Sequence, residues 1–374
     1  MEYEFDANEM LEGIREWVMV ESPTYHREGV NRMMDIVGEA TTGLGAMIER
    51  LPGKDGYGDV VKAHLPSTGD GPGILILSHL DTVHTVGTLE NILPYRQEGD
   101  KVFGPGIYDM KGGVYIAYYA LRQIIQAGDE IPLPVTFMFI PDEEVGSPTT
   151  RDLIEGEARK NKYVLVTEPA KNGKLVTGRF AFARFWLKAL GRPSHAGATL
   201  STGRSAIKEM AKQVLRIEDM TDEERGFTLA VGVISGGTFV NTVPIECRAQ
   251  VLAVMQTQET FDEVCGLMLG LEPIDPDVKF IVEQGPVRPL FEPSDEVLAL
   301  YAKAESIARE IGFVPGHGSF GGGSDGNFTG ALGVPTLDGL GVCGDGAHTY
   351  NEHLLYSSLE PRARLMAGLL QKLR

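Results

Sequence analysis

The stretch Gly73-Ile-Leu-Ile-Leu-Ser-His79-Leu-Asp81 decides the fold that the sequence predicts. Its run of four apolar residues indicates a buried β-strand. The strand leads directly into His79 and Asp81, at the end where open α/β sheets gather functional groups. If His79 binds a metal ion, Asp81 could orient it, because a metal-bound imidazole usually gives its other N–H to a carboxylate or carbonyl. The alternative is a solvated histidine on a strand-end turn.

Two later segments repeat this pattern of an apolar strand that ends in acids. Residues 134–146 read Pro-Val-Thr-Phe-Met-Phe-Ile-Pro-Asp-Glu-Glu-Val-Gly, which places Glu143 and Glu144 just after a strand, and a third strand runs into Glu168. Adjacent carboxylates repel each other unless a cation lies nearby or solvent screens them. One acid of the pair suits metal binding and the other proton transfer. An acidic surface loop is the alternative for this segment.

The fourth acid lies on a turn. Residues 104–113 read Gly-Pro-Gly-Ile-Tyr-Asp-Met-Lys-Gly-Gly, and a helix is expected directly afterwards over 114–127. An aspartate held on a turn ahead of a helix is aimed in one direction, and we expect Asp109 to bridge two metal ions. Taken alone, it would be read as a helix-capping residue at the surface. Three strands and one turn that each deliver His, Asp or Glu are much less expected by chance than any one of them.

Composition limits the classes of function. A chain of 374 residues favours two domains, and 43% hydrophobic with 23% charged residues is a soluble globular composition. The net charge of −18 argues against nucleic-acid and anionic-membrane partners. There is no signal-peptide pattern at the N-terminus and no apolar run long enough for a bilayer. Three cysteines without a CxxC spacing fit a reducing compartment, so we expect a cytoplasmic protein.

The texture of the chain changes in the middle. Residues 177–288 follow a β-α-β-β-α-β order, which indicates a compact inserted α+β module. We therefore expect an α/β protein with a mostly parallel twisted sheet flanked by helices, built from residues 1–176 and 289–374. The Gly-rich run near 316–326 lacks a phosphate-loop pattern, Ser324 is not in a GxSxG elbow, and there is no HExxH. Neither a nucleotide enzyme nor a serine hydrolase is favoured.

In order and spacing, a set of short motifs resembles the family of two-zinc amidohydrolases that includes glutamate carboxypeptidase, aminoacylase, acetylornithine deacetylase and succinyl-diaminopimelate desuccinylase. The motifs are His79-Leu-Asp81-Thr, Gly106-Ile-Tyr-Asp109-Met-Lys-Gly-Gly, Glu143-Glu144-Val-Gly, Glu168-Pro, Pro193-Ser-His195-Ala-Gly, Asn241-Thr-Val-Pro, Gly322-Gly-Ser-Asp325 and Gly346-Ala-His348. The resemblance spans nearly the whole chain and looks most like the bacterial glutamate carboxypeptidases. It implies a zinc-exopeptidase-like catalytic domain whose insert is a lid and dimerisation domain.

The resemblance also implies a ligand set for two zinc ions per chain, with a water or hydroxide between them. Asp109 would bridge the two ions. Cobalt or manganese could substitute, since a site rich in carboxylates with only two histidines tolerates them. The terminal ligands would be Glu144 and His348 for one ion, and His79 and Glu168 for the other.

Further roles are implied for neighbouring residues. Glu143 would be the general base, Asp81 the acid behind His79, and the Asp109–Met110 peptide bond would be cis. His195 and Asn241 would reach the substrate or its oxyanion, with His195 supplied by the other subunit of a homodimer formed through the inserted domain.

The match is weaker on the substrate side. Where the glutamate carboxypeptidases carry an acidic-x-Arg, this chain reads Leu252-Ala253-Val254, so the arginine is absent. Arg288 resembles a second arginine of the family pattern and could bind a carboxylate, or it could be a surface residue. Ser324 and Asp325 complete the expected substrate-binding residues.

The leading hypothesis is a zinc-dependent hydrolase of an amide or peptide bond in an N-acyl amino acid or dipeptide-like substrate with a free carboxylate. A deacetylase, desuccinylase or aminopeptidase of the same family is an alternative, as is a non-catalytic scaffold or a protein that stores or senses metal. The other histidines are expected to be incidental: four at the surface or in loops and one at the start of a helix. They are His26, His64, His84 and His317, and then His353.

Overall fold

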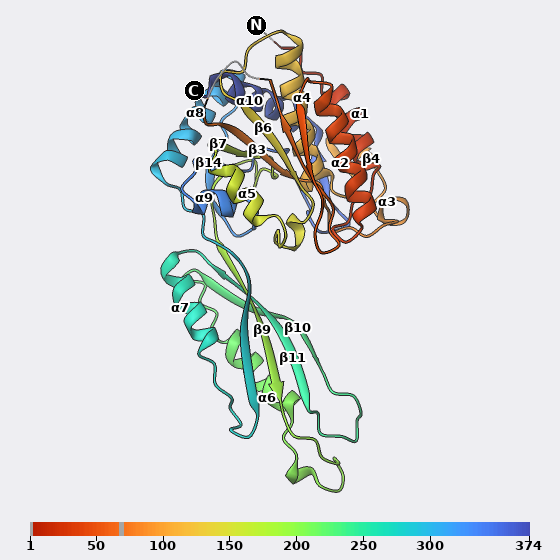
Figure 1. The fold of residues 1–374 in the computed structure, drawn as a ribbon, viewed down its shortest axis with the longest axis vertical. Coiled ribbons are helices and arrows are strands. Elements are labelled where there is room, and N and C mark those ends of the chain that lie inside the picture. The colour runs from red at the N-terminus through yellow and green to blue at the C-terminus, as the bar shows by residue number, and fades with distance from the viewer. Residues whose placement is uncertain (1–2, 67–70) are drawn as a thin grey trace. The chain divides into compact units, whose positions relative to one another are not determined.

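The computed structural model describes residues 3–66 and 71–374, which divide into two compact units. Unit 1 combines the chain up to Arg179 with Phe291–Phe320 and Ser324–Arg374. Unit 2 combines Phe180–Leu290 with the short segment Gly321–Gly323. Figure 1 shows both units in the colours of the chain and labels many of their helices and strands. The sequence expected the insertion at 177–288, which lies within a few residues of these bounds.

A six-stranded mixed sheet forms the centre of unit 1. Its strands, in order across the sheet, are β1 (Met47–Leu51), β2 (Val60–His64), β6 (Val135–Ile140), β3 (Gly73–His79), β7 (Asn161–Val166) and β14 (Thr336–Leu337). The last four run parallel to one another, whereas β1 and β2 pair antiparallel. The predicted parallel-rich α/β class is confirmed.

Helices cover both faces of this sheet. Because successive strand residues point to opposite faces, Ile74 and Ile76 of β3 join the larger core, and Leu75 and Leu77 join the smaller one. The larger core includes residues from the first two helices, the helix after Asp109 and the last helix. The helices of unit 1 are α1 (Ala7–Val18), α2 (Arg27–Thr42), α3 (Thr88–Asn91), α4 (Gly112–Gln126), α5 (Arg151–Ala158), α8 (Asp295–Ile311), α9 (Gly326–Ala331) and α10 (Leu359–Lys372).

Two small sheets complete unit 1, and the sequence did not predict them. One has the strand order β15 (Gly344–Asp345), β16 (His353–Leu355), β5 (Lys101–Phe103) and β4 (Arg96–Glu98). The other pairs β8 (Leu175–Arg179) with β13 (His317–Phe320) in parallel. His353 therefore begins a buried strand, and the expectation that it starts a helix is wrong.

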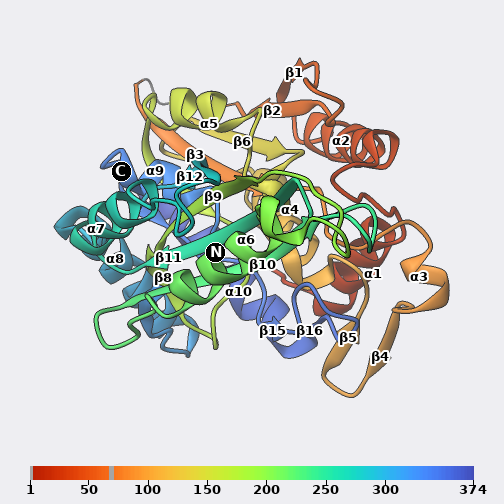
Figure 2. The ribbon, with the colours of Figure 1, turned by 90° about the horizontal axis from the view of Figure 1, so that it is seen from below.

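Unit 2 has one antiparallel sheet with the strand order β10 (Phe227–Gly236), β11 (Glu246–Met255), β9 (Ala181–Leu190) and β12 (Lys279–Arg288). Burial alternates along β9, as a sheet covered on one face requires. Both helices of the unit contact this sheet and appear with it in the second view (Figure 2). The predicted β-α-β-β-α-β order is present as β9 (Ala181–Leu190), α6 (Ala206–Glu218), β10 (Phe227–Gly236), β11 (Glu246–Met255), α7 (Gln258–Leu269) and β12 (Lys279–Arg288).

Within residues 3–66 and 71–374, no helix has both the length and the apolar character that crossing a membrane requires.

Candidate metal centre

Three adjacent parallel strands deliver ligand-type side chains to one edge of the central sheet. Strand β3 ends at His79, and its neighbours β6 and β7 are followed by Glu143-Glu144 and by Glu168. A fifth side chain, Asp109, lies on the turn just ahead of α4, and its peptide bond to Met110 is cis, as expected. Parallel strands end at the same edge, so residues far apart in sequence meet there.

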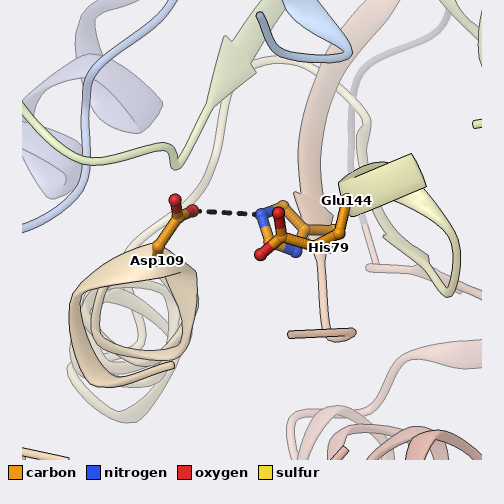
Figure 3. Close-up of side chains that lie close together, drawn as sticks. All are labelled: His79, Asp109 and Glu144. Atoms are coloured by element: carbon orange, nitrogen blue, oxygen red, sulfur yellow. Dashed lines mark hydrogen bonds and ion pairs between the residues drawn. The ribbon is translucent and has the colours of Figure 1, made fainter. Parts of the chain in front are cut away.

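The side chains lie at short distances from one another. His79 Nε2 is 3.3 Å from Asp109 Oδ1 and 3.7 Å from Glu168 Oε1. Figure 3 shows Asp109 and His79 facing each other, with Glu144 beside the imidazole. Ligand atoms of these three residues lie within 4.8 Å of one another, and so do those of His79, Glu143 and Glu168.

The sixth side chain of the cluster, His348, comes from the segment between β15 and β16. Its backbone adopts a left-handed conformation with φ of 64°, which an L side chain rarely does. His348 Nε2 is 3.0 Å from Glu144 Oε2 and 3.5 Å from Asp109 Oδ2. The structure thus brings together all five expected metal ligands and Glu143.

Asp81 orients this cluster in two ways. The Nδ1 atom of His79 is 3.0 Å from the Asp81 backbone carbonyl and 3.5 Å from its carboxylate, so the carbonyl is the nearer acceptor. The carboxylate of Asp81 instead accepts hydrogen bonds from the backbone N–H groups of Glu143 and Glu144, each at 3.2 Å, and from the Thr24 hydroxyl at 2.8 Å. Asp81 therefore fixes the His79 ring through its main chain and the Glu143-Glu144 turn through its side chain.

Burial of several charged groups together shifts their pKa values away from the ordinary ones. Burial and the negative charge of Asp109 raise the pKa of Glu144 to about 8. Burial and Asp109 also raise the pKa of Glu168 well above its ordinary value. Burial also tends to raise the pKa of Asp109. Hydrogen bonds donated by His348 and His79 outweigh this effect and hold that pKa far below its ordinary value. Hydrogen bonds that His348 donates to the carboxylates of Asp109 and Glu144 raise its pKa to about 11.

The donor set fits bound metal. Glu144 Oε1 is buried and has no hydrogen-bond partner, although a buried acceptor usually has one. Two ligand atoms on a tetrahedral zinc ion at about 2.0–2.1 Å lie about 3.3 Å apart. The closest pairs in the cluster are 3.0–3.7 Å apart. Imidazole and carboxylate are ligands that zinc accepts, so these residues can hold the metal.

His195 and Asn241 lie on two adjoining loops of unit 2. The Asn241 carbonyl accepts a hydrogen bond from Ala196 N at 2.9 Å, which joins the loops. His195 is exposed, and its Nδ1 accepts hydrogen bonds from Gly197 N and Ala198 N, each at 3.1 Å. Because Nδ1 is an acceptor, a neutral ring carries its proton on Nε2. The loop therefore presents His195 as a hydrogen-bond donor.

The remaining expected substrate-binding residues differ in exposure. Arg288, half-buried, ends β12, and its aliphatic stem lies so close to Gly323 that a side chain there would collide with it. Ser324 is buried and donates to Asp338 Oδ2 at 2.6 Å, and buried Asp325 accepts from the Ser147 hydroxyl. Ser324 and Asp325 are thus built into the scaffold of unit 1.

One polar pair escaped sequence reasoning. His84, which was expected at the surface or in a loop, is buried, and its Nε2 lies 2.6 Å from Glu352 Oε2. It lies in the loop between β3 and α3, as expected, and a partner 268 positions further along the chain makes its burial there possible. The sequence feature that could have pointed to this pair is the position of Glu352 close to His348 in the chain.

Comparisons with known proteins agree with this architecture. Carboxypeptidase G2 of a Pseudomonas species is 30% identical over 372 residues, covering 96% of this chain and 88% of that protein. Succinyl-diaminopimelate desuccinylase of Hydrogenovibrio crunogenus is 24% identical and covers 97% and 98%. A tripeptidase structure from Staphylococcus aureus superimposes with a TM-score of 0.78 at 21% identity, covering 98% of each chain.

Carboxylates and imidazoles gathered at the strand ends of such an α/β unit define a metal-dependent hydrolase. The chain belongs to the peptidase family M20/M25/M40, whose model matches residues 75–372. It is therefore a hydrolase of peptide or amide bonds. Enzymes of this family depend on metal, usually zinc.

Proposed function

We propose that this enzyme uses two zinc ions to hydrolyse the amide bond of an N-acyl amino acid or a dipeptide-like substrate that carries a free carboxylate. The observation that supports it most is the convergence of six ligand and base side chains at one edge of the sheet in unit 1. The names of the relatives, a carboxypeptidase and a desuccinylase, fall within this class of reaction.

Asp109 would bridge the two metal ions, since it lies near both histidines of the cluster. Zinc supplies Lewis acidity, which acidifies water and polarises the scissile carbonyl. Cobalt or manganese could take its place. The ligands would be Asp109, Glu144 and His348 on one side, and Asp109, His79 and Glu168 on the other.

Glu143 would carry the proton. Its main chain is held by the Asp81 carboxylate, and its side chain is buried beside His79 and Glu168. Its carboxylate would take a proton from the attacking water and later give it to the nitrogen of the leaving amine. A buried carboxylate with a fixed backbone is suited to this task because it loses little freedom when the reaction occurs.

His195 would stabilise the substrate carbonyl oxygen as that oxygen gains negative charge. Its exposed Nε2–H is a donor of the kind that an oxyanion requires. The adjoining Asn241 side chain, also exposed, would contact the substrate from the neighbouring loop. Unit 2 would thus act as a lid that supplies substrate contacts and no metal ligand.

We further propose a homodimer formed through unit 2, in which His195 serves the partner's site. Strand β10 lies at the edge of its sheet, and an unpaired edge can accept a strand from another chain. Apolar side chains are exposed along and just beyond it: Ile234 is 54% exposed and Phe239 is 74% exposed. Such an exposed apolar surface is typical of protein–protein contacts. The three free cysteines support a cytoplasmic location for the assembly.

Arg288 would bind the substrate carboxylate. Position 254, where an arginine stands in glutamate carboxypeptidases, holds the partly buried Val254 of β11. This leaves release of glutamate open beside desuccinylation, deacetylation and aminopeptidase activity.

We expect Arg288→Met to raise KM about 10–100-fold for substrates with a free carboxylate, because a hydrogen bond to a charged group contributes about 1.5–3 kcal/mol. Matched substrates with an amidated C-terminus should show little change, and an equal loss on both would contradict the assignment.

Metal analysis joined to a substrate screen tests the whole proposal. The metal content of the purified protein would be measured before and after zinc addition, with hydrolysis followed over N-acyl amino acids and dipeptides. About two metal ions per chain together with amide cleavage would support it. No bound metal after zinc addition would defeat it, and one ion per chain with full activity would defeat the two-metal assignment alone.

A further inference from the structure

A buried carboxylate outside the ligand cluster has every acceptor position filled. Glu352 is 1% exposed, and its Oε1 accepts hydrogen bonds from Tyr108 N at 2.9 Å and Asp109 N at 3.0 Å. Its Oε2 accepts from Gly106 N at 2.9 Å and is paired with His84 Nε2 at 2.6 Å. A carboxylate offers about four acceptor positions, so this one is saturated.

The three backbone donors all belong to the turn that presents Asp109. Buried N–H groups need partners, and in an irregular turn the main chain supplies few. Glu352 supplies partners for three of them from a segment more than 240 positions away in sequence. Its own carbonyl also accepts from Gly104 N at 3.4 Å, just before the turn. The conformation of residues 104–109 therefore depends on Glu352.

We propose that Glu352, supported by His84, is a positioning residue that holds Asp109 in place to bind metal. This rests on the proposed function, since it takes Asp109 as a metal ligand. The segment that carries Glu352 also carries His348, which contacts Asp109 Oδ2 directly at 3.5 Å. A single segment thus provides one ligand and fixes the main chain of another. Partners of this kind that orient a ligand contribute strongly to metal affinity.

Substitution of the carboxylate by an amide tests this role. In Glu352→Gln the NH2 group faces backbone N–H groups or the His84 ring instead of accepting from them. We expect zinc affinity, measured by chelator competition, to fall about 10–100-fold. In the metal-free protein, hydrogen exchange at the amides of Tyr108 and Asp109 should become at least about 10-fold faster, because their acceptor is weakened.

Glu21→Gln is the matched control. The Glu21 carboxylate accepts from the backbone N–H groups of Gly87 and Leu89 at 2.8 Å each, in the same unit and without contacting a proposed ligand. The same chemical change there should leave zinc affinity within about twofold of the parent. A comparable loss in both variants would mean that the effect is a general weakening of unit 1, and it would overturn the proposal.

Variants of His84 keep the proposal testable if Glu352→Gln fails to fold. His84→Gln retains an N–H donor for Glu352 Oε2 and should keep zinc affinity within a few-fold of the parent, whereas His84→Leu should lose about 10-fold. Equal affinity in His84→Leu and the parent would overturn the supporting role of His84. A parent protein that takes up no zinc would defeat the proposed function itself. A zinc-binding parent beside an unchanged Glu352→Gln would overturn only the positioning role.

Discussion

Two sets of buried acids in unit 1 differ in what neutralises them. In the scaffold, Glu157 accepts hydrogen bonds from Lys62 Nζ at 3.0 Å and Lys160 Nζ at 3.1 Å, and Asp338 binds the buried Arg179 through two bonds. In the metal centre, Glu144 pairs with the His348 imidazole at 3.0 Å and Glu168 with the His79 imidazole at 3.7 Å.

The pKa values separate the two sets. Burial tends to raise the pKa of Glu157, yet hydrogen bonds donated by Lys62 and Lys160 hold that pKa below its ordinary value. Burial raises the pKa of Glu144 to about 8, and the charge of Asp109 adds to the rise. Acids of the scaffold are neutralised by lysine and arginine side chains, whereas those of the centre would be neutralised by the proposed metal ions. The same residue type would therefore stabilise the fold in one place and bind metal in the other.

The largest effect is expected from Glu143→Gln. An amide cannot move the proton, so kcat should fall by at least about 10³-fold, while both metal ions stay bound. Steady-state kinetics with metal analysis on the same preparation would show this. Retention of more than a tenth of parental kcat would remove Glu143 from the role of base.

His195→Ala examines a site residue that lies outside the acid cluster, on a loop of unit 2. Loss of an oxyanion donor should lower kcat about 10²–10³-fold. Zinc affinity should stay as in the parent, because no acid of the centre depends on His195. Chelator competition would measure zinc affinity, and steady-state kinetics would measure kcat. A clear loss of zinc affinity would contradict the assignment of His195 to the substrate rather than to the metal.

A mixture of the His195→Ala and Glu143→Gln proteins tests whether the imidazole serves the partner's site. Activity should return in hybrid dimers, where one site combines an intact Glu143 with an intact His195. Two inactive parents that stay inactive after subunit exchange would place His195 in its own chain's site.

Glu144→Gln addresses the comparison directly. The amide is a poorer ligand, so zinc affinity should fall at least about 10–100-fold. The metal-free variant should melt no lower than the metal-free parent, because burial and the charge of Asp109 already disfavour the ionised form of Glu144. Calorimetry of both metal-free proteins would measure this. A clear drop in melting temperature would show that Glu144 stabilises the fold as a scaffold acid does.

The smallest effect is expected from Glu157→Gln, which should cost about 2 kcal/mol at pH 7 and leave activity unchanged, because Lys62 stays buried with a weaker partner. A carboxyl whose native pKa is lowered stabilises the fold above its unfolded pKa, and this stabilisation is lost as pH falls through the native pKa. The gap between parent and variant should therefore close below about pH 4. Thermal melts across pH would show it, with Glu155→Gln as a control, since its partners Arg151 and Arg159 are exposed. A gap independent of pH would contradict the ion-pair explanation.

Local pattern was enough to predict most of the fold and the ligand-type residues at the strand ends and on the Asp109 turn, whereas the role of His348 was expected only from the family resemblance. Strands β3, β6 and β7 are continuous apolar runs, and their functional residues follow immediately in sequence. Strand ends are positions that topology brings together, so a one-dimensional pattern carries three-dimensional information there.

The missed features depend on distant partners. Strands β15 and β16 have two and three residues, which is too short for any periodicity. The burial of His84 follows from Glu352, and the burial of Ser324 from Asp338, and neither pairing leaves a mark on the local sequence. Asp81 was expected behind His79, but its carboxylate chiefly receives the backbone of Glu143 and Glu144.

The position of the insertion has a consequence for synthesis of the protein. Arg179 and Phe291 exchange two backbone hydrogen bonds, so the chain leaves unit 1 and returns to it at the same point. On the ribosome, His79, Asp109 and Glu144 emerge before unit 2, whereas His348 and Glu352 emerge after it. During translation of unit 2, the nascent chain therefore contains the first three of these residues without the last two. The proposed metal site would therefore be complete only after unit 2 has been translated.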